Sequence, residues 1–432
     1  MIISIATIFP ELYKPFFDTS LLKRAKNQKI VDFDVSCLFD YVSPKERIDA
    51  PTFGHNAGML IKPTVVEAAV HAHQERHGEA YRIFFSPHGK KLTQRVAQDI
   101  AHKWQEKGHL LLIPARYEGI DARAEEEYAD EIISIGDYVL MGGDIPAMVL
   151  IESIVRLIPG IVGKQQSVDL DSFTGAFLDN PEYTEPVVWH DRVVPEIIRS
   201  GDHKKIQEWS EKVAAERTVV SHFDWFRKHA QSKKEYALAS GAMPAHYVAL
   251  MHDEINLPGE RIGTTSVTSL DIHDIARSAR TYGCKGYSIV TPLIDQQKIV
   301  QRLLDFWQTG TGIDYNPHRH EALDYVYLRS SLDEVIADIE RLEGQKPLLI
   351  ATSALSQAEH KAISYHDQEI VWKQKRPVLI LFGTGRGLSN SILERCDFIL
   401  LPVFGLSDFN HLSVRSAAAI VFDRWLGINP VI

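Results

Sequence analysis

The 432-residue sequence has few cysteines and no long apolar run. Its three cysteines, Cys37, Cys284 and Cys396, lie far apart and form no C-x-x-C pair, which argues against both a disulfide framework and a zinc ribbon. No apolar run approaches the ~20 residues that a membrane-spanning helix requires. Residues 1–8 lack the basic segment of a signal peptide and have the pattern of a first strand. We therefore expect a cytoplasmic protein without a membrane partner.

The chain also lacks an excess of positive charge. Its formal net charge of −10 argues against non-specific nucleic-acid binding, because affinity for phosphates comes from lysine and arginine. The segment 199–234 differs, since it holds nine basic and five acidic side chains, with Trp209, Trp225 and Phe226 among them. This segment is either a solvated helical face or a local surface for RNA.

Length and periodicity predict an α/β protein of two or three domains. Residues 1–160 alternate strand-like and helix-like runs, which indicates a mostly parallel sheet covered by helices. Residues 161–171 have no periodicity and are expected to be a linker, and residues 172–240 are expected to be helical. A second α/β pattern occupies residues 244–432.

The expected elements can be given by residue range. Strands are expected at 2–8, 33–38, 81–85, 110–113, 132–135, 247–252, 287–290, 325–328, 348–351, 378–382 and 398–401. Helices are expected at 14–28, 64–77, 92–106, 271–282, 295–307, 332–342, 356–365 and 412–425.

Two loop sequences carry the most information about function. One is R-Y-E-G-I-D at 116–121, and the other is I-G-D-Y-V-L-M-G-G-D-I-P-A-M at 135–148. Each follows a predicted buried strand, and open α/β sheets bind ligands at the carboxyl ends of their strands. Gly142 and Gly143 either allow backbone N–H groups to approach a ligand or form only a tight turn. Pro146 suits the first turn of an apolar helix.

These loops resemble those of bacterial tRNA (guanine-N1)-methyltransferases. The resemblance spans residues 2–226 and includes F-F-S-P-H-G-K-K-L at 84–92, S-I-V-R-L-I-P-G at 153–160 and D-S-F at 171–173. The family belongs to the SPOUT class, whose S-adenosylmethionine site is a trefoil knot in the backbone. The resemblance implies a homodimer that methylates guanine N1 at tRNA position 37, next to the anticodon, and that has no DNA partner. Mg²⁺ is a further family expectation without a visible ligand motif, and the sequence predicts no metal site.

Methylation at guanine N1 requires specific groups. N1 carries a proton at neutral pH, so a carboxylate must accept this proton while a cation or N–H donor stabilises the charge that spreads to O6. The resemblance implies Asp171 as the general base and Arg156 as the cation near O6. It implies Glu118 and Arg116 in guanine and cofactor binding. The alternatives are that Asp171 or Asp169 caps a helix and that Arg156 serves a structural ion pair.

The resemblance also assigns the residues that hold the cofactor. Tyr138 among them is expected to lie partly in the core. The sequence departs from the family in the Gly-rich loop at 54–59 and at Ala115. It also has fewer basic residues than the family at 209–211 and 220–222. These departures bear on tRNA affinity more than on chemistry. The implied cofactor-binding residues are Ser86, Pro87, Arg116, Tyr117, Gly119, Ile135, Gly136, Tyr138, Leu140, Gly142, Gly143 and Pro146.

The second α/β part resembles SpoU-type RNA methyltransferases. Segments 269–283, 381–389 and 401–417 match their three motifs in the expected order, as in SAM-dependent RNA methyltransferases that bacteria sometimes fuse to the first enzyme. Asp271 replaces the motif-one asparagine, and the acidic residue of motif two is not evident. This part therefore either methylates RNA or binds SAM or RNA without catalysis. Its candidate residues are Arg277, Gly383, Gly385, Gly387, Leu401, Pro402, Gly405 and Leu412.

The resemblances together imply two SPOUT-type trefoil-knot domains joined by a small helical domain that binds tRNA. The competing interpretation for the whole chain is a non-catalytic RNA-binding regulator that retains both scaffolds.

Overall fold

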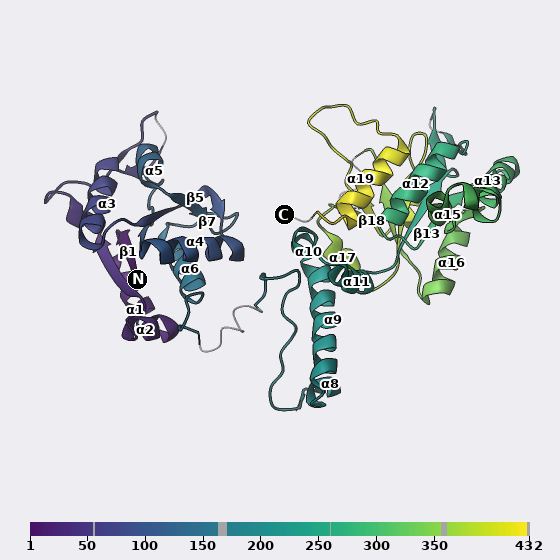
Figure 1. Cartoon of the computed structure of the whole chain (residues 1–432). Coiled ribbons are helices and arrows are strands. Elements are labelled where there is room, and N and C mark those ends of the chain that lie inside the picture. Colours follow the sequence, from purple (N-terminus) through teal and green to yellow (C-terminus); the bar gives the residue numbers. More distant parts are fainter. Residues whose placement is uncertain (55–56, 163–170, 260, 356–360, 430–432) are drawn as a thin grey trace. The chain divides into compact units, whose positions relative to one another are not determined.

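The structure of the protein is a computed structural model, in which residues 1–54, 57–162, 171–259, 261–355 and 361–429 are described. The chain divides into two compact units, residues 1–174 and 175–432 (Figure 1). Each unit contains a parallel sheet with helices on both faces, so the predicted α/β class is confirmed. None of the described helices is both long and apolar enough to cross a membrane.

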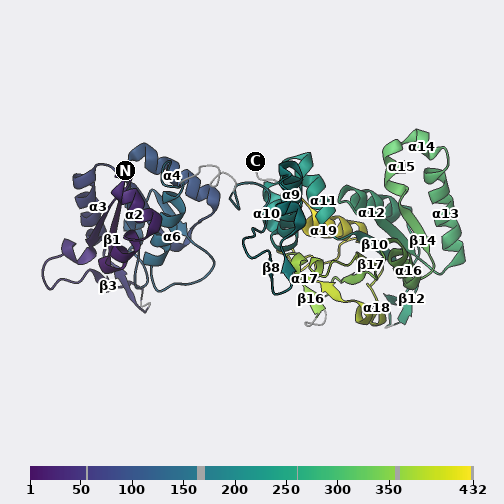
Figure 2. The same cartoon turned by 90° about the horizontal axis from the view of Figure 1, so that it is seen from below.

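The first unit is built on a five-stranded parallel sheet in the order β2-β1-β6-β5-β7. Along β1, Ile3 and Ile5 enter a core with α4 and α6, whereas Ala6 enters a second core with α3 and α5. Figure 2 shows α3 and α6 on opposite sides of β1. The elements are β1 (Ile2–Thr7), η1 (Pro10–Leu12), α1 (Tyr13–Phe17), α2 (Ser20–Asn27), β2 (Asp32–Cys37), η2 (Leu38–Tyr41), β3 (Asp49–Pro51), β4 (Met59–Ile61), α3 (Pro63–His77), β5 (Tyr81–Lys91), α4 (Gln94–Lys107), β6 (His109–Ile113), α5 (Ala122–Tyr128), β7 (Glu131–Ser134) and α6 (Asp144–Val155).

The second unit has a seven-stranded parallel sheet in the order β14-β13-β10-β17-β15-β18-β16. Along β10, Val248 and Leu250 enter a core with α12 and α19, whereas Ala249 and Met251 enter a smaller core with α16 and α18. The elements are β10 (His246–Met251), β11 (Ile255–Leu257), β12 (Arg261–Gly263), α12 (Ser269–Thr281), β13 (Gly286–Val290), α13 (Ile294–Gln308), α14 (Gly312–Tyr315), α15 (Pro317–Leu323), β14 (Val326–Arg329), α16 (Leu332–Glu343), β15 (Leu348–Thr352), β16 (Ala362–Ile363), α17 (Gln368–Trp372), β17 (Val378–Gly383), α18 (Asn390–Arg395), β18 (Phe398–Leu400) and α19 (Val414–Leu426).

The segment 175–242 packs into the larger core of the second unit. The Phe223 ring of α10 meets the Trp372 ring of α17 edge to face, with 4.8 Å between ring centroids. Arg227 of α10 donates hydrogen bonds to three backbone carbonyls at the end of α19. The elements of the segment are β8 (Val188–Trp189), β9 (Arg192–Val193), α8 (Glu196–Arg199), α9 (His203–Ser221), α10 (Phe223–His229) and α11 (Lys233–Ala242).

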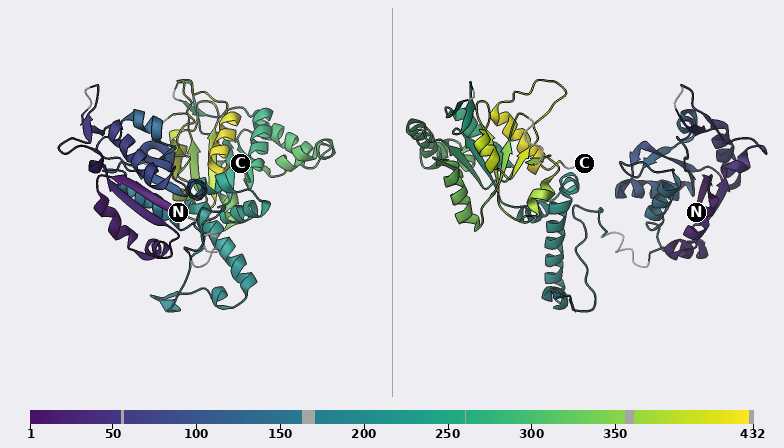
Figure 3. Two further views of the ribbon diagram at one scale, coloured as in Figure 1. Left: turned by 60° about the vertical axis from the view of Figure 1, so that its left-hand side comes forward. Right: turned by 180° about the vertical axis from the view of Figure 1, so that it is seen from behind.

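Helix α9 projects from the second unit with α8 at its outer end (Figure 3). The chain before α8 lies along it, because the Leu178 amide donates to Thr218 Oγ1 at 2.8 Å and the Tyr183 and Trp209 rings lie 6.4 Å apart. The basic side chains of α9 are exposed: Lys204, Lys205, Lys212 and Arg217. This exposure fits both interpretations of the basic segment.

All of the predicted strands are present, and three expected helices are wrong in whole or in part. The helix expected at 14–28 is broken between α1 and α2, where the chain turns so that Phe17 and Leu22 both reach the core. Residues 172–195 contain no helix in their described part, because three prolines and a glycine interrupt them. The helix expected at 356–365 falls partly outside the described residues, and its remainder contains strand β16 instead. Most of the predicted linker, 163–170, also lies outside the described residues.

Candidate active site

A cavity of about 470 Å³ opens at the carboxyl ends of β6 and β7 and beside the middle of β5 in the first unit. This volume lies within the range of small-molecule sites, about 300–1,000 Å³. The pairing of β5 with β7 jumps from Phe85 to Lys90, so the residues between them bulge out of the sheet and reach the cavity. Glu118 and every predicted cofactor-binding residue line it: Ser86, Pro87, Arg116, Tyr117, Gly119, Ile135, Gly136, Tyr138, Leu140, Gly142, Gly143 and Pro146.

The glycine pair allows two of the lining loops to touch. A Cβ on Gly142 would lie 2.4 Å from Cδ of Arg116, and one on Gly143 would lie 2.7 Å from the Ala115 nitrogen. The Gly143 N–H donates to the Ala115 carbonyl at 2.7 Å. Loop packing therefore requires both glycines, and the N–H of Gly143 is already bonded within the protein. Approach of the remaining N–H groups to a ligand stays a prediction.

Arg116 is held at the cavity wall by a buried carboxylate. Its Nε donates to Oδ2 of Asp144 at 2.9 Å, and Asp144 is only 1% exposed. The other oxygen of Asp144 accepts hydrogen bonds from Thr7 at 2.6 Å and Tyr13 at 3.1 Å. Burial and the Asp144 charge raise the pKa of Tyr13 far above its ordinary value, so this phenol remains a donor. The guanidinium also lies 4.5 Å from the centre of the Phe9 ring.

The tyrosines and Glu118 form the open side of the cavity. Tyr117 has a φ of +57°, a strained conformation of the kind that concentrates at ligand sites. Tyr138 is 56% exposed, so the expectation that it lies partly in the core is wrong. Its ring packs back against Gly136, where a Cβ would lie 2.4 Å from Tyr138 Cε1, and its hydroxyl donates to the Ile135 carbonyl at 3.4 Å. Glu118 is exposed, and its N–H is bonded to the Met59 carbonyl at 3.0 Å.

Two further ionisable residues line the cavity and were missed by sequence reasoning. His88 Nδ1 lies 2.6 Å from Ser86 Oγ, and His88 Nε2 lies 3.6 Å from a carboxylate oxygen of Glu125. Burial raises the pKa of Glu125, while the nearby His88 opposes this shift. His88 belongs to the F-F-S-P-H-G element, one of the motifs that carry the family resemblance, so this motif could have indicated it. Glu125 belongs to a run of three glutamates and gave no signal.

The proposed catalytic pair lies apart from the cavity lining. Arg156 and Asp171 form an ion pair at 2.5 Å, with about a third of each side chain exposed. Neither residue is among those that line the described cavity. The first described helix after Asp171 is α8, which begins at Glu196, so the alternative that Asp171 caps a helix is wrong. Arg156 does have a carboxylate partner. Asp169 lies outside the described residues.

The glycine loop of the second unit packs against the β11–β12 hairpin region. Gly385 has a φ of +58°, and a Cβ there would lie 3.3 Å from both Ile255 and Thr265. Thr384 bonds the Thr265 hydroxyl at 2.5 Å. Positive φ at Gly387 (+92°) also favours glycine, and a Cβ on Gly383 would lie 2.7 Å from the Leu388 nitrogen. The structure therefore accounts for three of the four predicted glycines, and only Gly405 combines room for a Cβ with a φ that is not positive.

The other predicted residues of this unit lie on exposed loops and on α12. β17 and β18 flank β15 in the sheet, so the loops that follow them open at one edge. Leu401 and Leu412 are 38% and 46% exposed, Gly405 is exposed, and Pro402 is buried.

Helix α12 carries the predicted Arg277, which is exposed. It also carries Asp271, whose side chain forms an ion pair with a residue of α19. Asp271, at the motif-one position, forms an ion pair with Arg415 of α19 at 3.2 Å. Sequence reasoning missed this pair, because its members are 144 residues apart.

Comparisons with known proteins agree with both resemblances. A family model described as tRNA (Guanine-1)-methyltransferase TrmD matches residues 1–228, and one described as SAM-dependent RNA methyltransferase matches residues 245–427. The tRNA (guanine-N(1)-)-methyltransferases of Nitratidesulfovibrio vulgaris and Oleidesulfovibrio alaskensis are each 36% identical over 430 residues, which is 98% of this chain and 99% of theirs. That of Dictyoglomus turgidum is 38% identical over 237 residues, which is 55% of this chain and 94% of its own. The chain belongs to the tRNA (guanine-N1)-methyltransferase family.

Proposed function

We propose that this protein transfers a methyl group from S-adenosylmethionine to N1 of a guanine in tRNA, at position 37 beside the anticodon. One observation carries the proposal. The residues that the resemblance assigns to cofactor and guanine binding come from three separate loops, yet they line a single cavity of suitable volume. The full-length relatives that bear this activity in their names support it.

The cavity suits a cationic cofactor. S-adenosylmethionine supplies a methyl group on a positively charged sulfonium, and Glu118 and Glu125 place carboxylates at the cavity wall. Arg116 is neutralised by Asp144, so its charge does not oppose binding. The fixed loops orient the methyl group for in-line attack, which is where most of the rate enhancement of such a transfer arises.

Asp171 and Arg156 supply the two charges that the chemistry needs. Removal of the N1 proton requires a base, and the developing negative charge on O6 requires a cation beside it. The ion pair already places a carboxylate next to a guanidinium. A bound guanine would insert between them, with N1 toward Asp171 and O6 toward Arg156.

We also propose that the protein is a homodimer in which Asp171 of one chain serves the cavity of the other. Asp171 is not among the residues that line the cavity of its own chain, which supports this arrangement. So does an apolar stripe before and along α6, where Met141 is 91% exposed, Ile145 54% and Val149 40%. Exposed apolar patches of this kind mark interfaces. A trefoil knot around the cofactor loops belongs to the same proposal.

The functional division of the chain follows the sequence boundaries. We assign 1–160 to a SPOUT methyltransferase domain, 161–171 to a linker, and 172–240 to a tRNA-binding domain whose described helices begin at Glu196. Residues 244–432 form a second SPOUT-type domain that binds or methylates RNA, as its family-model match suggests. The exposed lysines of α9 offer a basic surface for tRNA. The cytoplasm, where tRNA is modified in bacteria, is the expected location.

The test is methylation of defined tRNA by the purified full-length protein. Transcripts with guanine or adenine at position 37 are incubated with S-adenosylmethionine, and 1-methylguanosine is measured by mass spectrometry of nucleosides. We expect product only with guanine at that position. Asp171→Asn should lower turnover about 10²–10⁴-fold while cofactor affinity stays unchanged. Asp99→Asn, an exposed acid on α4, is the matched control.

Normal turnover of Asp171→Asn would remove it as the base and point to Asp169. Binding of tRNA without any methylation would favour the non-catalytic regulator. Titration of the same reaction with Mg²⁺ and a chelator tests the family expectation for that ion.

A further inference from the structure

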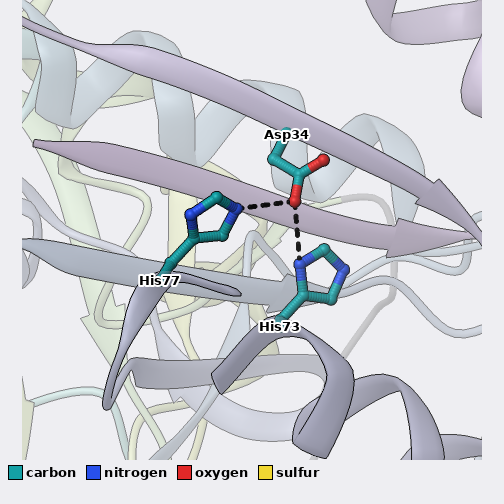
Figure 4. Close-up of side chains that lie close together, drawn as sticks. All are labelled: Asp34, His73 and His77. Atoms are coloured by element: carbon teal, nitrogen blue, oxygen red, sulfur yellow. Dashed lines mark hydrogen bonds and ion pairs between the residues drawn. The ribbon is translucent and has the colours of Figure 1, made fainter. Parts of the chain in front are cut away.

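A cluster of metal-ligating side chains joins the edge strand β2 to helix α3, outside the cofactor cavity. Asp34 of β2 faces His73 and His77, which lie one turn apart on α3 (Figure 4). One nitrogen of each imidazole and one carboxylate oxygen all lie within 4.8 Å of one another. None of these residues has a part in the proposed methyl transfer.

The imidazole of His73 lies between a hydroxyl and the carboxylate. Its Nε2 lies 2.7 Å from Ser36 Oγ, and its Nδ1 lies 3.3 Å from Oδ2 of Asp34. In the tautomer protonated at Nε2, Ser36 Oγ accepts that proton and the Nδ1 lone pair faces the carboxylate, an arrangement that a cation between the two stabilises. The His73 side chain is fully buried, so bulk water does not solvate its Nδ1.

Arg76 is the cation that lies beside both Asp34 and His73 in the structure. It donates to Asp34 Oδ2 at 2.8 Å and approaches His73 Nδ1 at 3.5 Å. Its side chain is 44% exposed, so it can swing into solvent and leave the position to another cation. His109, whose ring lies 5.4 Å from that of His77, cannot act as a ligand, because Gly78 and Ser4 occupy both of its nitrogens.

We propose that Asp34, His73 and His77 form a binding site for Zn²⁺ or a similar first-row transition metal, with Arg76 as its internal competitor. Two imidazoles and one carboxylate are ligands that zinc prefers, whereas Mg²⁺ prefers oxygen ligands. Ligand atoms around a tetrahedral zinc ion lie about 3.3 Å apart. The His73–Asp34 distance is already 3.3 Å, and the His77–Asp34 distance of 2.8 Å has to open only slightly. The partial exposure of Asp34 (24%) and His77 (22%) leaves room for a water as fourth ligand.

The bound ion would link β2, at the edge of the sheet, to α3 on its face. A ligand that binds only the folded protein stabilises it in proportion to its free concentration. The site therefore acts on the stability of the first unit and not on the chemistry in the cavity. Its test is independent of the proposed methylation.

The experiment is a metal titration of the full-length protein after treatment with a chelator. Zn²⁺ binding is followed by calorimetry, and Co²⁺ binding by the visible absorption of the bound ion. We expect one high-affinity ion per chain. Asp34→Asn and His77→Gln should each weaken binding by at least about tenfold, because loss of even an outer-shell partner costs about 10–100-fold. Circular dichroism shows that each variant is folded.

Two further variants make the assignment specific. His71→Gln changes an exposed histidine on the same helix and should leave the affinity unchanged. Arg76→Gln removes the competing cation and should tighten binding. The proposal is overturned if the wild-type protein takes up no stoichiometric ion, or if uptake is unaffected by both Asp34→Asn and His77→Gln.

Discussion

Substitution of Arg227 by methionine tests whether the helical segment and the second α/β sheet unfold as one unit. Arg227 is 7% exposed and lies on α10. Its Nε donates to the Gly427 carbonyl at 2.9 Å, and NH2 donates to the carbonyls of Asp423 at 2.9 Å and Arg424 at 3.0 Å. Carbonyls in the last turn of a helix lack partners within the helix, and a cation is favourable at that end.

The cost of Arg227→Met can be worked from these contacts. A hydrogen bond to a charged donor contributes about 1.5–3 kcal/mol, so three independent bonds would contribute about 4.5–9 kcal/mol. They share one guanidinium, and methionine fills similar space without the desolvation cost of a buried charge. We therefore expect a net loss of about 2–4 kcal/mol in the free energy of unfolding of the second unit.

Hydrogen exchange measured by mass spectrometry at increasing urea concentration separates the two units. Peptides from α9, α10 and α19 should lose protection together at a lower urea concentration, while peptides from residues 1–174 keep theirs. Lys228→Met, an exposed neighbour on the same helix, is the control and should change neither. An unchanged midpoint would refute the energetic reasoning. Loss of protection in α9 and α10 alone would show that the segment is a separate domain.

Three other predictions follow from the sites described. Mixing Asp171→Asn chains with Gly142→Val chains should restore part of the methylation activity, since each mixed dimer has one intact site; no recovery in verified heterodimers would argue against the shared site. Burial lowers the pKa of His246, whose Nε2 accepts the Trp425 indole N–H, to about 4. The unfolded chain therefore takes up this proton first as the pH falls. The second unit should lose about 2 kcal/mol from this residue between pH 7 and pH 5, measured by urea unfolding, and His246→Gln should show a shallower dependence. Glu125→Gln should weaken binding of S-adenosylmethionine about three- to tenfold by calorimetry, and an unchanged affinity would show that this carboxylate does not attract the cofactor.

The sheets could be predicted from the sequence because buried parallel strands are short, continuous apolar runs. Leu110–Ile113 and Val378–Phe382 are such runs, and both form central strands. The prediction of helix at 172–195 is wrong, because three prolines interrupt the segment and its two strands, β8 and β9, are only two residues long and too short to show an alternating pattern. Periodicity reports only whether one face of an element is buried. It does not report against which neighbour that face packs.

The same limit applies to the sites. The loops that line the cavity could be predicted, because each directly follows a strand and parallel strands end at one edge. The metal-ligand cluster could not: His73 and His77 share a helix face by their spacing, but Asp34 lies 43 residues before His77 on a different element. The side-by-side position of β2 and α3 is a property of the fold. Likewise, the need for glycine at position 143 comes from the backbone of Ala115.

The helical segment 175–242 packs into the second unit, although most of it matches the family of the first unit. The first family match ends at residue 228, within α10, whereas the buried cluster of the second unit includes Phe223 and Phe226 of that helix. The sequence boundary between the two families therefore cuts through a shared core. Because the exposed lysines of α9 are fixed to the second sheet by this core, any tRNA bound by α9 is held at a set distance from the glycine loop at 383–387.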